Sequence, residues 1–199
     1  MEEGKSKSSL RVHKKGIRAF GIAESFVNGE NVSSVLAGVV LRADMILDGF
    51  AFNKAMVGGM DATQKIVEMY TSLERDDVNV LLLNGCVISW YNVVDLNFVS
   101  RAVGLPLVCV TYEDSGGLEK FFKENFPEDW KPRVEIYHSN GPRKLLKLHT
   151  GSSVYVRSIG LSEEETIMLL NKFTLNGSVP EPLRIAQLLA RNFRQSKLC

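Results

Sequence analysis

The sequence lacks several features that would assign it to a functional class directly. Its 24 basic and 23 acidic side chains leave a net charge of +1, so a nucleic-acid partner would have to meet a local basic surface rather than the charge of the whole chain. No apolar run approaches the roughly 20 residues that cross a bilayer, because Arg42, Asp44 and Asp48 interrupt the best candidate. Internal repeats, a phosphate-binding P-loop, a GxSxG nucleophile turn and zinc-ligand spacing are also absent.

Cysteine and histidine are both scarce. The three cysteines cannot all pair, and Cys86 and Cys109 stand in apolar, strand-like stretches where small buried thiols are common. This usage favours a cytoplasmic protein. The three histidines are scattered singly, which is more typical of surface or strand positions than of metal ligands.

The length and composition favour one domain. A chain of 199 residues, 45% of them hydrophobic, is long enough to bury one substantial core. The first 16 residues are polar and charged and contain no apolar signal core. We therefore predict a flexible N-terminal lead-in at residues 1–16 and a single domain at residues 17–199.

The stretch from Val78 to Asp95, VNVLLLNGCVISWYNVVD, is the one around which the chain is organised. Its nearly unbroken apolar run at residues 78–83 is typical of a strand that is covered on both faces. The run ends at Asn84-Gly85, and sites in open α/β sheets lie just beyond the carboxyl ends of central strands. Asn84 is therefore a candidate site residue, although the Asn-Gly pair is equally typical of a simple turn.

Three strand-like segments come before this stretch, at residues 18–26, 34–43 and 45–55. The second and third are separated by almost nothing, which predicts an antiparallel pair joined near Ala43-Asp44. Glu24 falls at the end of the first segment. Asp48 interrupts the third, and an acidic residue inside a strand is costly unless it faces solvent, accepts hydrogen bonds or binds a cation.

Helical patterns alternate with the later strands. Asp61 and Gln64 have capping-box spacing ahead of a helix with one apolar face. Further on, the pattern predicts a short helix at 97–103, a strand at 106–111 and an apolar helical face between 118 and 126. Three strands followed by alternating helices and strands indicate an α/β fold, with a mixed sheet that has an antiparallel meander at one side.

The remainder, from Pro127 onward, is less regular. Short candidate strands fall at 134–137, 145–149 and 154–157, Ser162 and Glu165 form a second capping box, and Pro180-Glu181-Pro182 opens a last helix. Basic residues here either contact phosphates or form a solvated edge: Lys131, Arg133, Arg143, Lys144, Lys147 and Arg157. In the last helix, Arg184 and Arg191 share a face that either meets a polyanion or is solvated.

Four blocks together carry a resemblance to a known family: GIAESF at 21–26, LDGFAFNKAMVGGMDATQKI at 47–66, NGCVISWYNVVDL at 84–96 and PEPLRIAQLLA at 180–190. They resemble the mainly archaeal family of domain of unknown function ninety-nine, which are relatives of endonuclease V. The resemblance covers most of the chain, from about Arg18 to Ala190. It implies a ribonuclease H-like fold, in agreement with the meander followed by alternating helices and strands.

The resemblance also implies an activity. Relatives of endonuclease V cut a nucleic-acid strand beside a deaminated base, and they use carboxylates at adjacent strand ends to hold Mg²⁺. Some members of the resembled family are described as acting on deoxyuridine in DNA. Carried onto this chain, the implied ligands of Mg²⁺ or Mn²⁺ are Glu24, Asp48 and Asn84. Asp95 would help to orient water, and Arg184 and Arg191 would bind the nucleic acid, most plausibly DNA.

The sequence departs from the family pattern at two of these positions. The first strand of the family usually ends in paired acidic residues, where this chain has Ala23-Glu24. The central strand usually ends in Asp-Gly, where this chain has Asn84-Gly85. Three hypotheses follow: an endonuclease with a weakened Mg²⁺ site, a catalytically inactive nucleic-acid-binding module, and a structural or dimerising protein. The first hypothesis depends on a geometric expectation: the side-chain oxygens of Glu24, Asp48 and Asn84 converge on one water-filled hollow.

Overall fold

The computed structural model describes residues 12, 14, 16–27, 32–114 and 116–196. Most of the predicted lead-in at 1–16 lies outside these residues. The strands are β1 Arg18–Ser25, β2 Ser33–Arg42, β3 Leu47–Met56, β4 Val80–Asn84, β5 Val87–Ile88, β6 Asn92–Val93, β7 Leu107–Thr111, β8 Lys144–Lys147 and β9 Ser153–Ile159. The helices are α1 Ala62–Thr71, α2 Leu96–Val103, α3 Glu119–Asn125, α4 Trp130–Ser139, α5 Glu163–Phe173 and α6 Glu181–Gln195.

The predicted mixed sheet is confirmed. In the described residues it has seven strands in the order β3-β2-β1-β4-β7-β9-β8, and β5 and β6 form a separate small hairpin. The meander β1-β2-β3 is antiparallel, whereas β1, β4 and β7 run parallel to one another. The carboxyl ends of these three parallel strands therefore meet at one edge of the sheet, and this edge is the natural place for a site.

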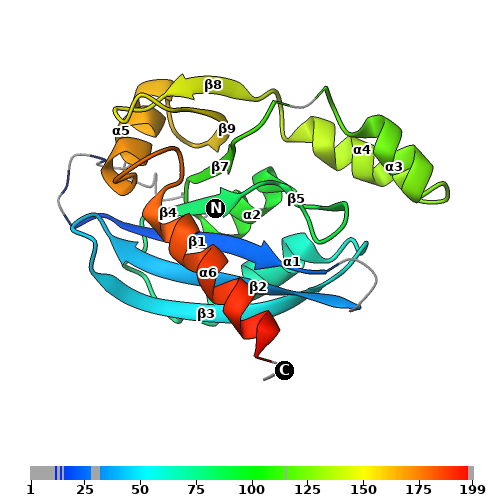
Figure 1. Ribbon diagram of the computed structural model, residues 1–199, viewed down its shortest axis with the longest axis horizontal. Helices are drawn as coiled ribbons and strands as arrows, with labels where there is room; N and C mark the ends of the chain where they lie inside the picture. The colour runs from blue at the N-terminus through cyan, green and yellow to red at the C-terminus, as the bar shows by residue number, and fades with distance from the viewer. Residues whose placement is uncertain (1–11, 13, 15, 28–31, 115, 197–199) are drawn as a thin grey trace, which may run out of the picture.

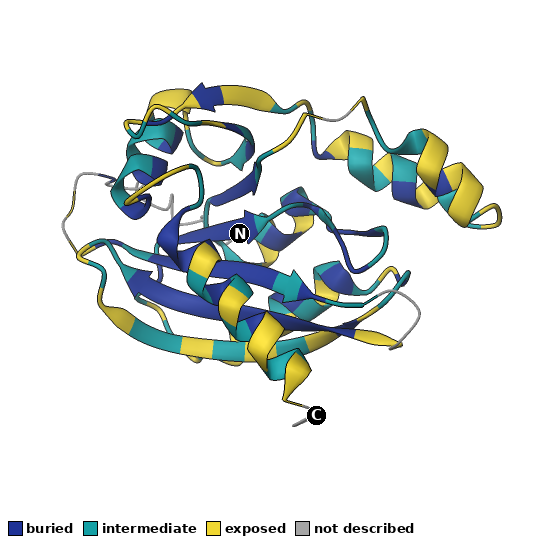
Figure 2. Ribbon diagram, viewed as in Figure 1, coloured by how far each residue is buried: buried dark blue, intermediate teal, exposed yellow. Residues whose placement is uncertain are grey.

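Helices cover both faces of the sheet (Figure 1). On the face that we call the α6 face, α5 and α6 pack on a core that includes Ala19 and Ala23 of β1. On the opposite α1 face, α1 and α2 pack on a core that includes Phe20 and Ile22. Because successive side chains of a strand point to opposite faces, β1 contributes alternate residues to the two cores. Figure 2 shows the central strands buried and the outer edge of β3 exposed in part.

Two local predictions are wrong: the capping box at Asp61 and the strand at 134–137. Asp61 stands at the N-cap of α1 as predicted, but its carboxylate makes no cap hydrogen bond; it accepts from the backbone N–H of Met56 and the amide of Asn92. The strand predicted at 134–137 is part of helix α4. Helix α4 is held in place by the buried guanidinium of Arg133, which donates to the carbonyls of Gly58, Gly59 and Tyr91. Such tertiary contacts outweigh the weak strand propensity of four residues.

Other predicted elements follow the sequence pattern, whereas the β5–β6 hairpin was not predicted. The β2–β3 hairpin turns where predicted, with the backbone N–H of Met45 donating to the carbonyl of Arg42. Ser162 and Glu165 form the predicted capping box of α5, and α6 has proline in its first turn. None of the helices in the described ranges has both the length and the apolarity that a membrane crossing requires.

The contact between α6 and β1 depends on Gly21, so we predict that Gly21→Ala destabilises the fold. A Cβ at position 21 would lie 2.6 Å from the carbonyl carbon of Pro182 and 2.8 Å from its oxygen, so a backbone segment would have to move. We expect a loss of about 1–3 kcal/mol in the free energy of unfolding, measured by urea titration. Gly16→Ala, where a Cβ meets nothing within 4 Å, is the control. Equal stability of the two variants would contradict the packing described.

Candidate functional site

The ends of β1, β4 and β7 are aligned by their strand register. Ile22 of β1 is opposite Leu83 of β4, and Asn84 of β4 is opposite Val110 of β7. In a parallel pair, residues opposite each other point to the same face. The alignment therefore fixes which face each side chain at this edge can reach.

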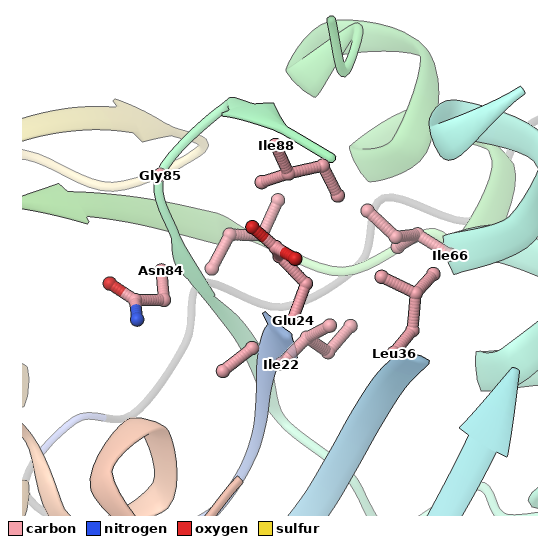
Figure 3. A pocket seen from close by; sticks show the side chains of 9 residues that line it. Ile22, Glu24, Leu36, Ile66, Asn84, Gly85 and Ile88 are labelled. Carbon is pink, nitrogen blue, oxygen red and sulfur yellow. The ribbon is translucent and has the colours of Figure 1, made fainter. Parts of the chain in front are cut away.

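At this edge, the side chains of Glu24 and Asn84 point to opposite faces of the sheet. Asn84 follows the buried Leu83 of the α1-face core, so its side chain points to the α6 face, as does that of Ala23. Glu24 lies one residue beyond Ala23 and so points to the α1 face. Figure 3 shows the Asn84 amide directed to one side of β4 and the Glu24 carboxyl to the other. Both residues belong to the lining of one small pocket, but their polar ends point to opposite sides of β4, so the predicted convergence of their side-chain oxygens is not seen.

Glu24 lies in a small, mainly apolar pocket. Its walls include Ile22, Leu36, Ile66 and Ile88, and the cavity of about 10 Å³ offers about the space of one water molecule. One carboxyl oxygen, Oε1, accepts a long hydrogen bond of 3.4 Å from the backbone N–H of Ser89. The other, Oε2, is buried without a partner among the described residues. Burial raises the pKa of Glu24 to about 7, and the Ser89 hydrogen bond offsets this only in part.

The pocket is closed by a strained loop between β5 and β6. Ser89, Trp90 and Tyr91 all have left-handed backbones, with φ of 47°, 59° and 63°. Such a conformation costs an L-residue roughly 1–2 kcal/mol. Neighbouring contacts hold the loop in place, because Ser89 is hydrogen-bonded to the Ser34 hydroxyl and its carbonyl accepts from the N–H of Gly58.

Asp48 lies at the other end of the sheet. Its carboxylate accepts from Arg18 Nε at 2.6 Å, and Arg18 begins β1. Six residues separate Arg18 from Glu24 along this strand, a distance of about 20 Å. At the level of Glu24, β2 contributes Leu36 and β3 contributes Asn53. The predicted convergence is therefore not seen for Asp48 either, because the β2–β3 hairpin turns at the amino end of β1.

Asp95 has a structural role in this arrangement. It is the N-cap residue of α2, where its side chain accepts from the N–H of Phe98 at 2.8 Å. Its own backbone N–H donates to the Thr63 hydroxyl. The first contact caps α2 and the second ties α2 to the start of α1, and the cap accounts for an acidic residue at this position.

Two residues that the sequence analysis did not single out belong to the α6 face. Tyr112 lies two residues beyond Val110, packs against the α6-face core, and has a buried hydroxyl with no partner in the described part of the chain. Burial raises the pKa of this phenol. Glu181 opens α6 and is almost fully buried, with its carboxylate bound by Arg184 Nε at 2.7 Å. No sequence pattern marks Tyr112, whereas Glu181 lies within the PEPLRIA block.

The donor set at this edge does not fit Mg²⁺. The ion requires near-octahedral oxygen coordination and is usually held by one or two carboxylates. On the α6 face, Ala23 has no donor atom, Asn84 contributes a neutral oxygen, and Glu181 is already neutralised by Arg184. Glu24 faces the other way among apolar side chains. No group of three or more His, Cys, Asp or Glu side chains in the described ranges has a metal-binding arrangement.

The predicted nucleic-acid-binding arginines occupy different settings. Both are exposed on α6, but Arg184 is paired with Glu181, whereas Arg191 makes no ion pair in the residues that the structure describes. One turn after Arg191, Arg194 Nε donates to the Ser25 hydroxyl at 3.0 Å, which places this end of α6 at the carboxyl end of β1. At the end of β7, Arg143 is bound by Asp114 and the Glu113 carbonyl. Cations therefore border the site edge from two sides.

The buried carboxyl predicts how stability depends on pH, tested with Glu24→Gln. In the folded state Glu24 stays protonated up to about pH 7, whereas in the unfolded chain it ionises near its ordinary 4.5. The wild-type free energy of unfolding should therefore fall as the pH rises through this window, by about 3 kcal/mol from this group. Glu24→Gln does not titrate, so the variant should be the more stable protein at about pH 8 and match the wild type at about pH 4.

Urea titrations at several pH values check this expectation. Glu113→Gln, at an exposed carboxylate near the same end of the sheet, should leave the pH profile unchanged. Parallel profiles for the wild type and Glu24→Gln would mean that Glu24 is solvated and ionised in the folded protein.

Comparisons with known proteins agree with this fold. Residues 15–194 match the family model described as Endonuclease dU. The chain is 37% identical to a UPF0215 protein of Pyrobaculum calidifontis over 175 residues, which cover 87% of this chain and 95% of that protein. A UPF0215 protein of Pyrococcus furiosus is 32% identical over 188 residues, covering 91% of this chain and 94% of its own length.

Solved structures show the same architecture. A protein of unknown function from Archaeoglobus fulgidus superposes with a TM-score of 0.75 at 25% identity, covering 89% of this chain and 98% of that one. Endonuclease V of Ciona intestinalis was solved in complex with a 24mer DNA containing an inosine followed by a ribo-adenosine. It superposes with a TM-score of 0.60 at 13% identity, covering 92% of this chain and 87% of that one. The likeness to endonuclease V confirms the ribonuclease H-like fold. Because the Endonuclease dU model spans nearly all of the sequence, the chain belongs to that family.

Proposed function

We propose that this chain is a nucleic-acid-binding member of its family, in which the metal-dependent hydrolysis of a phosphodiester has been lost. The observation that carries the proposal is the position of Ala23 and Asn84, each one residue beyond the paired Ile22 and Leu83. The two residues lie near the carboxyl ends of adjacent parallel strands on one face of the sheet, and neither brings a negative charge. Divalent cations depend on such charges for affinity, and the carboxyl of Glu24 on the opposite face does not replace them.

The partner is nucleic acid, and DNA with a deaminated or altered base is the substrate class to test first. The matched family is described as Endonuclease dU, and an endonuclease V of the same fold has been solved with inosine-containing DNA. In this chain, Arg191 and Arg194 near the end of β1, and Arg143 near the end of β7, border the edge at which such a strand would lie. Basic side chains at these places suit a phosphate backbone.

The competing hypothesis is a weakened endonuclease that binds one Mg²⁺ or Mn²⁺ through Glu24 and Asn84. It requires the two side chains to act on one ion from opposite faces of the sheet. It also requires Glu24 to ionise inside an apolar pocket that raises its pKa to about 7. The binding module requires neither change, so the site supports it better.

Incubation with deoxyuridine- and inosine-containing oligonucleotides in Mg²⁺ or Mn²⁺ tests the proposal. We expect binding that weakens as salt is raised and no strand nicking in either metal. Arg191→Ala should weaken binding severalfold for all sequences and lower the salt slope by about one. Lys120→Ala, at an exposed lysine on α3, is the matched control and should change neither.

Two results would count against the proposal. Nicking by the purified wild type that disappears in Asn84→Ala would show a working catalytic site and favour the endonuclease. Absence of any salt-sensitive binding to either oligonucleotide would instead favour a purely structural protein.

A further inference from the structure

A second cavity lies outside the site edge, against the outer side of β9. It has a volume of about 340 Å³, which is within the range of small-molecule sites. β8 pairs with β9 only as far as Val156, although β9 continues to Ile159. The cavity fills the space beyond the end of this pairing, between the Gly141-Pro142 turn and the start of α5. None of the side chains discussed at the ends of β1 and β4 lines it.

Arg157 forms part of the wall of this cavity and is more than nine-tenths buried. Its Nε donates to the carbonyl of Gly141 at 2.8 Å, and Nη1 donates to Cys86 Sγ at 3.3 Å. The guanidinium also stacks over the ring of Tyr137, 4.9 Å from its centre. These contacts hold the group in one orientation and leave the second terminal nitrogen without an acceptor among the described residues.

The charge of Arg157 is poorly compensated. In the part of the chain that the structure describes, no carboxylate forms an ion pair with it, whereas buried charges in proteins are normally paired. Cys86 is the nearest compensating group: the hydrogen bond with Cys109, opposed by burial and assisted by the charge of Arg157, lowers the pKa of its thiol. A bound anion would supply a full compensating charge.

The other walls suit an organic molecule that carries such an anion. The hydroxyls of Ser158 and Thr166 lie 2.8 Å apart and give this wall a polar surface, although the Thr166 hydroxyl already donates to the carbonyl of Ser162. Leu146 and Leu161 provide apolar surface, and Lys144 at the exposed rim is paired with Glu163. This combination of one fixed cation, a few hydroxyls and apolar walls is typical of small-molecule sites.

We propose that this cavity, the β9 pocket, binds a small organic oxoanion, a phosphate or a carboxylate, with Arg157 as the residue that holds the anionic group. Because Nε and Nη1 already donate to Gly141 and Cys86, the remaining terminal nitrogen donates to an oxygen of the anion, in a charge-assisted hydrogen bond. The site is separate from the nucleic-acid edge, so the proposal stands whether or not the chain binds DNA.

Nuclear magnetic resonance titration of the full chain with inorganic phosphate, with acetate and with chloride at matched ionic strength tests the proposal. We expect saturable shifts of the Gly141 and Ser158 amide signals with phosphate or acetate, with a millimolar Kd because these probes contain only the anionic group, and none with chloride. Preference between phosphate and acetate assigns the oxoanion.

Arg157→Lys should weaken this binding about tenfold, since one ammonium nitrogen cannot keep the contacts with Gly141 and Cys86 and also donate to the anion. Because Arg157 is buried and its replacement can destabilise the fold, Leu161→Trp provides a second test, in which the indole fills the pocket while Arg157 remains. Lys147→Ala, on β8 but outside the pocket, is the control. Absence of saturable shifts with both oxoanions, or binding unchanged in Leu161→Trp, would overturn the proposal.

Discussion

The alternation of side chains along two parallel strands is the constraint on which this site depends. β4 is buried on both faces, so its register against β1 and β7 is fixed by the core, and a shift by one residue would reverse every side chain. With that register, Ala23 and Asn84 share one face while Glu24 points to the other. The edge therefore consists of two different environments: an apolar pocket with one protonated carboxyl, and a polar face without net negative charge.

Most of the fold could be predicted from the sequence, because its signals are local. Apolar runs, turn residues and capping patterns located β1 to β4, β7, α5 and α6. The exception was α4, whose helix depends on the contacts of Arg133 with Gly58, Gly59 and Tyr91, far away along the chain. The β5–β6 hairpin was also missed, since three consecutive left-handed residues, none of them glycine, leave no sequence signature.

The candidate site was predictable only in its position. The sequence pointed to the end of β4, which lies at the edge where the parallel strands end, but which side chains meet there depends on register and direction. The hairpin near Ala43-Asp44 already implied that Asp48, just after the turn, would lie near the start of β1, where the structure pairs it with Arg18. The separation of Glu24 from Asn84 needed the register of β1 against β4, and Tyr112 emerged only from its buried hydroxyl.

Membership of a nuclease family is compatible with the lack of a suitable set of metal ligands among the residues that the structure describes. The family match and the endonuclease V likeness concern the sheet, the helices and their packing, whereas hydrolysis depends on a few side chains placed on that fold. Features such as the close contact of Gly21 with Pro182 maintain the architecture irrespective of those side chains. The strained loop over Glu24 is likewise held by contacts with Ser34 and Gly58 and needs no metal ion.

The most direct test of this account compares the Mn²⁺ affinity of the wild type with that of the double variant Ala23→Asp/Asn84→Asp. Isothermal titration calorimetry measures both affinities. Two carboxylates on the α6 face should create a saturable site that the wild type lacks, while Asp48→Asn, at the far end of the sheet, should behave as the wild type does. Tight Mn²⁺ binding by the wild type, or no gain in the double variant, would contradict the account.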